Sequence, residues 1–240
     1  MASTWIKPST RPTTIDDLVN GVDRYNPTNL SILEDYLYHQ IRSEEYDCLA
    51  NLAILKLYQF NPDIYNPDIV INILIKALAA SPLPDFNLCI SLLDERTAPS
   101  HLDEPDPLPS TLPQLKDLQN LLYRCRFPAF WETYLSDEFE NLRDNYTVEV
   151  TGFENSIRQV AIRAVTATFT RISSERLGSY LNLEGDGLVS YVKSLGWEID
   201  SSTGTIIVPP NPDNQIEATV VQEQIKLPQL TKLISHAVKA

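Results

Sequence analysis

The first 150 residues carry their apolar residues in windows of about twelve to eighteen residues, separated by Pro, Asn and Asp. Windows of this length indicate helices, because strands are usually shorter. The clearest window, Tyr46 to Phe60, leaves few polar positions on any face, so we expect a central helix there. A second window predicts a helix over Asp68 to Ala80. We expect about seven helices in this region, which places the chain in the mostly α class.

The dipeptide Asn-Pro recurs between these windows, at Asn26-Pro27, Asn61-Pro62 and Asn66-Pro67. An Asn side chain can accept hydrogen bonds from the free amides of a helix start, and proline has its φ already set for the first helical position. The interval of about 35 to 40 residues is that of one helical hairpin in a solenoid. Residues 15–150 are therefore predicted to form a HEAT/TPR-like helical repeat.

Two segments of this half are expected to lie outside the helices. Residues 1–14 lack the apolar core of a signal peptide and are predicted to be a flexible N-terminus. The segment 97–113 contains five prolines and three carboxylates, a composition that neither packs nor forms a helix well. We predict a Pro-rich surface loop that buries almost nothing.

The pattern changes near residue 150. An amphipathic helix begins after Thr151, and the later elements come in the order helix, helix, strand, hairpin turn and strand. This order predicts a winged-helix module over residues 151–212, and residues 213–240 are expected to hold a C-terminal amphipathic helix. The elements expected after the first helix are Ser174–Leu181, Gly187–Leu195, Trp197–Asp200, Thr205–Val208 and Pro228–Val238.

The charge of the chain limits its partners. The net charge is −13, and most of it lies in residues 1–150, so phosphate groups are repelled at long range. The third helix of the expected winged helix has Lys193 as its one cation, whereas a specific DNA reader neutralises on the order of 6 to 10 phosphates. We therefore expect protein partners, with no specific DNA and no membrane. A winged-helix nucleic-acid regulator is the alternative.

No catalytic, cofactor or metal site is expected, and the chain is predicted not to be an enzyme. The three histidines fall in different predicted elements, and the three cysteines have no CxxC spacing. Cys48 and Cys125 are expected on apolar helix faces, where cysteine is usually a small buried hydrophobe. The acidic runs at 44–47 and 137–140 are interpreted as solvated helix surface. An enzyme with an unfamiliar site remains a third alternative.

Localisation is predicted from the same features. The odd number of cysteines indicates a reducing compartment, and the longest apolar stretch, Ile69 to Ala80, is too short to span a bilayer. A cytoplasmic protein is expected.

A partner surface is predicted at the C-terminal end of the chain. The expected last strand has no later strand to cover its outer edge, and the terminal helix carries an apolar stripe; both suit protein contacts. An alternative is that this helix folds back on its own solenoid. The predicted partner-binding residues are Thr205, Ile206, Ile207 and Val208 on the strand, and Leu230, Leu233 and Ile234 on the helix.

Several strings of the sequence resemble a known family, the K subunits of eukaryotic translation initiation factor three. The longest of them contains the run Leu-Tyr-Gln-Phe-Asn-Pro, and the similarity covers roughly residues 15 to 235. It departs in the Pro-rich segment and in the first dozen residues. The strings are Gly21 to Pro27, Ala50 to Pro62, Asp85-Phe86 with Leu88-Cys89, Phe130-Trp131, Thr151 to Glu154 and Gly196-Trp197.

The resemblance implies a HEAT-like helical domain followed by a winged helix, which is the PCI-type architecture shared with proteasome-lid and signalosome subunits. It also implies a non-enzymatic structural subunit of the initiation factor three complex, associated with the small ribosomal subunit mostly indirectly. The L subunit is the expected direct neighbour. A scaffold subunit of another PCI complex is the alternative within this class.

Overall fold

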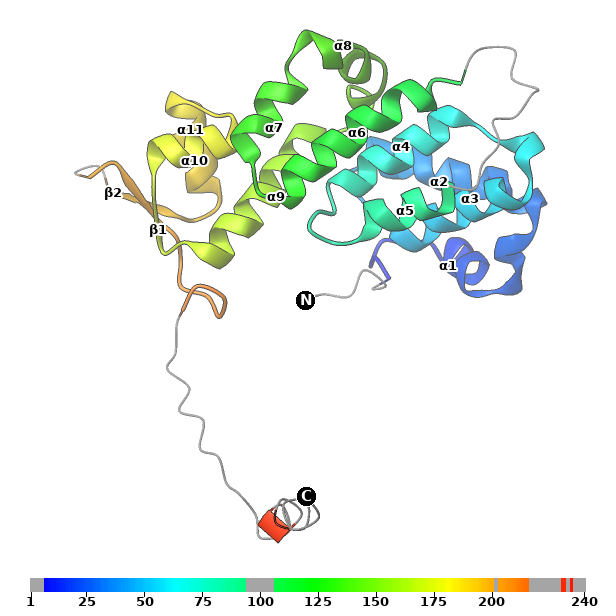
Figure 1. The fold of residues 1–240 in the computed structure, drawn as a ribbon, viewed down its shortest axis with the longest axis horizontal. Helices are drawn as coiled ribbons and strands as arrows, with labels where there is room; N and C mark the ends of the chain where they lie inside the picture. The colour runs from blue at the N-terminus through cyan, green and yellow to red at the C-terminus, as the bar shows by residue number, and fades with distance from the viewer. Residues whose placement is uncertain (1–6, 94–105, 201–202, 216–229, 232–233, 235–240) are drawn as a thin grey trace.

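The computed structural model describes residues 7–93, 106–200, 203–215, 230–231 and 234. Within these ranges the N-terminal helices stack into a solenoid, and a winged helix lies at its far end (Figure 1). Helix α9, Phe153–Thr168, joins the two parts.

Seven α-helices of eight or more residues make up the described part of the solenoid, followed by a short irregular helical stretch. Single 3-10 turns separate some of them, at Val22–Tyr25 (η1), Pro27–Asn29 (η2) and Pro62–Ile64 (η3). The stretch after α7 is η4 (Asp137–Phe139), α8 (Glu140–Leu142) and the π-helical η5 (Arg143–Thr147). The seven helices are α1 Thr13–Asn20, α2 Leu30–Arg42, α3 Cys48–Phe60, α4 Pro67–Leu78, α5 Asp85–Leu93, α6 Leu108–Tyr123 and α7 Phe127–Tyr134.

The helices form two layers. Helix α3 contacts α1 and α5, while α4 contacts α2 and α6. Successive helices from α1 to α5 also contact each other, as do α6 and α7. Alternate helices therefore share a layer, as in a helical repeat. The core lies between the layers, where α4 buries ten of its twelve residues, from Ile69 to Leu78. This explains why that window has apolar residues on every face.

The Asn-Pro sites behave in two ways. The Asn66 side chain accepts hydrogen bonds from the amides of Asp68 (3.0 Å) and Ile69 (3.5 Å), so it caps α4 as predicted. The Asn26 side chain caps η2 in the same manner. Asn61 does not cap the following 3-10 turn; its amide instead donates to the Leu57 carbonyl at 2.9 Å, at the C-terminal end of α3.

The prediction of a loop over 97–113 is wrong for its last six residues. Helix α6 begins at Leu108, Pro109 lies in its first turn, and Pro113 lies inside it. A proline is tolerated in a first turn because the amide that it lacks would be unpaired there in any case. Leu108 and Thr111 are buried, so burial of α6 against α4 offsets the hydrogen bond lost at Pro113. Residues 97–105 lie outside the described residues.

The prediction of a flexible N-terminus is wrong for residues 7–14. The Arg11 guanidinium is buried and donates to both carboxylate oxygens of Asp47, at 2.6 and 2.7 Å. Asp47 also caps α3 through the amide of Ala50. It is therefore a buried, paired acid, and the interpretation of residues 44–47 as solvated surface is wrong at this position.

The winged helix contains α10 (Ser174–Leu181), α11 (Gly185–Ser194) and a three-stranded antiparallel sheet. Its strands are β1 (Arg171–Ser173), β2 (Glu198–Asp200) and β3 (Thr205–Ile207), in the order β1-β3-β2. Sequence reasoning missed β1, because a three-residue strand with one apolar residue, Ile172, has no detectable alternation.

Side chains from α7 and α9 hold the winged helix against the solenoid. The Trp131 indole donates to the Tyr180 carbonyl at 2.8 Å, and the Arg158 guanidinium donates to the Leu181 carbonyl at 2.9 Å. Both carbonyls lie near the C-terminal end of α10, where a helix leaves its carbonyls without intrahelical partners. Arg163 donates in turn to the carbonyls of Ala79 and Ser81 between α4 and α5.

Candidate partner-binding surfaces

The predicted strand edge is not an edge. Strand β3 pairs with β1 through Ile206↔Ile172 and with β2 through Ile206↔Ile199, so both of its sides are occupied. Ile206 and Val208 are buried, and Thr205 and Ile207 are half-buried. A free edge was expected because no later strand was predicted, whereas the covering strand β1 precedes β3 in the chain. Within the described residues, no strand pairs with the outer side of β1 or of β2.

The predicted C-terminal stripe is described only in part. Leu230 is 44% exposed and Ile234 is 57% exposed. Leu233 lies outside the described residues. The two described side chains therefore leave much of their apolar surface in solvent, as a contact surface for another chain would.

Helix α11 presents little positive charge. Leu188 and Val192 point inward and are buried, while Ser190, Lys193 and Ser194 are exposed. Tyr191 is half-buried, and its hydroxyl accepts a hydrogen bond from the Gln159 side chain at 3.1 Å. Lys193 is the one cation of this helix. A surface of this kind lacks the charge needed to hold a phosphate backbone.

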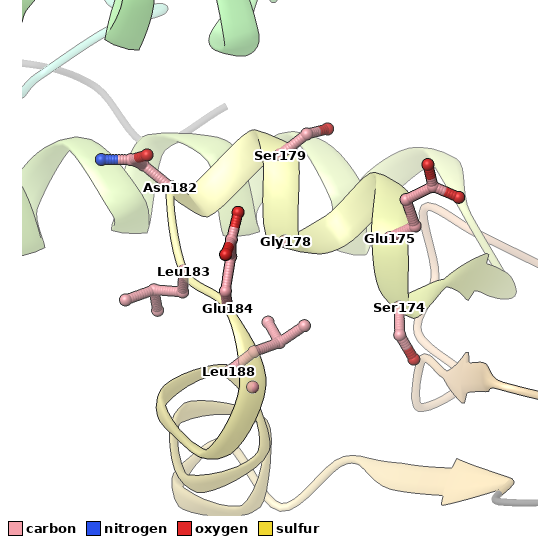
Figure 2. Close-up of a pocket in the computed structure, with 9 residues that line it drawn as sticks. Ser174, Glu175, Gly178, Ser179, Asn182, Leu183, Glu184 and Leu188 are labelled. Carbon is pink, nitrogen blue, oxygen red and sulfur yellow. The ribbon is translucent and has the colours of Figure 1, made fainter.

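A groove of about 430 Å³ lies in the angle between α10 and α11. Figure 2 shows Asn182, Leu183 and Glu184 on the turn that closes it, with Glu175 and Ser179 on α10. A Cβ at Gly178 would lie 2.8 Å from the Leu183 carbonyl oxygen, so this close approach of turn and helix requires glycine. The other lining residues are Ser174, Gly185 and Leu188.

The lining of this groove is polar and partly acidic. It offers carboxylates, hydroxyls and an amide, but no imidazole, thiol or amine. The hydroxyls of Ser174 and Ser179 donate to the backbone carbonyls of Gly204 and Arg176, at 2.8 Å each, and not to a carboxylate that could act as their base.

The thiols elsewhere differ from one another. Burial raises the pKa of Cys48 to about 12 and also raises the pKa of Cys89. Both therefore stay protonated and unreactive at neutral pH. The expectation that Cys125 is buried on a helix face is wrong: Cys125 is exposed in the turn after α6, with a φ of 55°. The apolar run extends to Leu122 but does not continue through the turn.

Across residues 7–93, 106–200 and the shorter described stretches, His, Cys, Asp and Glu side chains do not gather in groups that could hold a metal ion. In the same residues, no helix combines the length and apolarity needed to cross a bilayer.

The sequence model of the CSN8/PSMD8/EIF3K family matches residues 64–220. This stretch begins in η3 and runs through the second part of the solenoid and the whole winged-helix sheet. The chain belongs to the CSN8/PSMD8/EIF3K family. Membership confirms the mostly α prediction, with a helical repeat followed by a winged helix.

Relatives within the CSN8/PSMD8/EIF3K family match over almost the whole chain. A protein of Mycosarcoma maydis named eukaryotic translation initiation factor 3 subunit K is 43% identical, covering 98% of this chain and 95% of the relative. Proteins of the same name from Cryptococcus neoformans and Phaeosphaeria nodorum are 40% and 39% identical, covering 97% and 95% of this chain and 94% of each relative. The family resemblance in the sequence strings is confirmed.

Proposed function

We propose that this protein is a non-catalytic structural subunit of the translation initiation factor three complex in the cytoplasm. The observation that carries the proposal is near full-length identity of about 40% to relatives named as subunit K of that factor. The match spans 95% and 94% of these two relatives, so the similarity is not confined to one of their parts. Its role is to support assembly of the complex and, mostly indirectly, association with the small ribosomal subunit.

Two properties of the described residues support a scaffold over an enzyme or a nucleic-acid regulator. Both buried thiols have raised pKa values, and the serine hydroxyls of the α10–α11 groove donate to backbone carbonyls and not to a carboxylate base. Helix α11 has a single cation for phosphate contact. The chemistry of the winged helix therefore favours contacts with other proteins.

The contact surface that we propose differs from the one expected from sequence. A partner strand can pair only with the outer side of β1 or β2, because β3 is central. We further propose that Leu230, Leu233 and Ile234 add an apolar contact with the partner. The L subunit is the proposed direct neighbour.

The test is co-purification from cells of the source organism, with an affinity tag on the N-terminus. The wild-type chain is expected to retain the other initiation factor subunits, and Leu230→Asp/Leu233→Asp/Ile234→Asp is expected to lose the direct neighbour. Val148→Asp is the control for an apolar-to-Asp change elsewhere on the surface, because Val148 is 71% exposed directly after η5. The proposed function would be overturned if the wild-type protein retained no initiation factor subunit. Equal retention by the triple variant would overturn only the contact surface.

A further inference from the structure

A second surface lies at the solenoid end away from the winged helix, where α1, η1, α3 and α5 meet (Figure 1). It is a groove of about 260 Å³, which we call the α1–α3 groove. Its floor is apolar, and its rim carries two cations and an exposed ring. The lining residues are Val19, Asn20, Arg24, Tyr25, Leu49, Leu52, Ala53, Lys56 and Leu92.

The apolar surface continues beyond the floor. Tyr25 is 48% exposed, Phe60 is 58% exposed, and their ring centroids lie 6.3 Å apart. Val22, beside Tyr25 on η1, is 83% exposed. Large exposed apolar side chains that gather at one place mark contact sites more often than single ones do.

The two cations are held by aromatic rings. The Arg24 guanidinium carbon lies 4.9 Å from the Tyr25 centroid, and the Lys56 ammonium lies 4.7 Å from the Phe60 centroid. Their hydrogen bonds go to neutral oxygens, Arg24 to the Val19 carbonyl and Lys56 to the Gln59 side chain. A guanidinium has five donors and an ammonium three, so most donors of both groups are not used in these bonds.

The charge of this groove is opposite to the net charge of the chain. The chain has 32 acidic against 19 basic residues, yet none of the nine lining residues is a carboxylate. Among the described residues, neither Arg24 nor Lys56 forms an ion pair. A positive, apolar site on a negative molecule complements a ligand that is both acidic and apolar.

The volume indicates what kind of ligand fits. Small-molecule and cofactor pockets usually measure about 300 to 1,000 Å³ and enclose the ligand with few polar groups. A smaller groove between exposed rings suits the side chains of a peptide segment, as in helix-in-groove recognition. We propose that the α1–α3 groove docks a short acidic segment of a partner protein, with aliphatic side chains on the Leu49 and Leu52 floor and carboxylates toward Arg24 and Lys56.

The test uses a phage-displayed library of peptides of about 12 residues, selected on the full-length chain. Selected peptides are expected to combine Asp or Glu with Leu, Ile or Phe. Binding of a fluorescein-labelled selected peptide is then measured by anisotropy, and the double variant Arg24→Glu/Lys56→Glu is expected to raise Kd about tenfold or more. The difference should shrink at high salt.

Arg124→Glu/Arg126→Glu is the matched control, because both arginines are exposed in the turn between α6 and α7 and the charge change is equal. Its peptide affinity should equal that of wild type, and circular dichroism melting checks that both variants fold. Basic or neutral selected peptides, no selected peptide, or equal affinity of the groove variant would overturn the proposal. The proposal would also be overturned if the wild-type chain forms a dimer that Arg24→Glu/Lys56→Glu abolishes. In that case a second copy of the chain occupies the groove.

The chain's own acidic segment is tested separately by replacing residues 94–105 with a Gly/Ser linker. Unchanged peptide affinity is expected. An increase in peptide affinity of about tenfold or more would show that this segment occupies the groove. That result would also overturn the proposal. The proposed function is tested by co-purification of initiation factor subunits, which is a separate measurement. Failure of the peptide experiment therefore leaves the proposed function unaffected.

Discussion

At the scale of single residues, the pair of Arg11 and Asp47 stabilises the start of the solenoid. Both side chains are almost fully buried, and the two hydrogen bonds between them measure 2.6 and 2.7 Å. Arg11→Leu would leave the Asp47 carboxylate buried without its cation, which costs about 3 to 5 kcal/mol. We expect the free energy of unfolding in urea to fall by about that amount.

Lys7→Leu is the control for this prediction. Lys7 also pairs with a carboxylate, that of Asp16 at 2.8 Å, but its side chain is 51% exposed. Exposed pairs contribute about 0.2 to 1 kcal/mol, so this variant should unfold almost as wild type does. Equal losses in the two variants would show that burial does not decide the strength of the Arg11 pair.

A second residue gives the stability a pH dependence. The Lys76 ammonium is buried and donates to the carbonyls of Gln40 (2.7 Å) and Ser43 (3.4 Å). Burial lowers its pKa from 10.5 to about 8. Between these values the unfolded chain binds more protons than the folded one, so the free energy of unfolding rises with pH.

The expected rise in the free energy of unfolding from Lys76 reaches about 3 kcal/mol over that window. Lys76→Met lacks the titrating group, so the difference between the two proteins should increase from pH 8 upward. Tyrosines with raised pKa values, such as Tyr36 and Tyr58, affect both proteins alike. Urea unfolding at a series of pH values measures the difference; parallel curves would refute the assignment.

At the scale of elements, helix α6 depends on burial to begin inside a proline-rich sequence. Leu108 is 8% exposed at its first position, and Leu115, Leu118 and Leu122 continue the buried face. Leu108→Ala is expected to lower the free energy of unfolding by about 2 to 3 kcal/mol. Lys116→Ala, exposed on the same helix, should change it by less than about 0.5 kcal/mol. A neutral Leu108→Ala would restore the interpretation of this segment as a surface loop.

The winged helix gives a second prediction for elements. Because α11 has one cation, the isolated protein should bind duplex DNA or structured RNA no more tightly than about 10⁻⁶ M at physiological salt. The affinity is measured by fluorescence anisotropy, with a labelled DNA duplex of about 20 base pairs and with a labelled RNA hairpin. A salt-sensitive Kd well below that value would instead favour the winged-helix regulator.

At the scale of the whole molecule, the contacts of α7 and α9 predict that solenoid and winged helix unfold together. Trp131 and Arg158 bond to α10, and Arg163 bonds to the α4–α5 connection, so α9 belongs to both parts. Circular dichroism and tryptophan fluorescence should therefore report the same urea midpoint. Trp131→Phe should lower that midpoint for both probes, since the Tyr180 carbonyl loses its donor. Two separate transitions would show that the parts are independent.

The order and type of most elements followed from local patterns in the sequence. Apolar windows located α3 and α4, Asn66 was recognised as the cap of α4, and α10 was predicted at Ser174–Leu181. Each of these features depends on residues within about four positions of one another, as helix periodicity and capping do. The acidity of the chain and the family strings were likewise readable without any knowledge of the fold.

Tertiary structure decided the features that join distant residues. Strand β3 is central because β1, more than thirty residues earlier, pairs with it, and no local pattern marks β1. Asp47 is buried because Arg11, 36 positions away, reaches it. The α1–α3 groove likewise combines side chains of four separate elements. Pairings over such separations depend on how the helices and strands pack, so local periodicity contains no record of them.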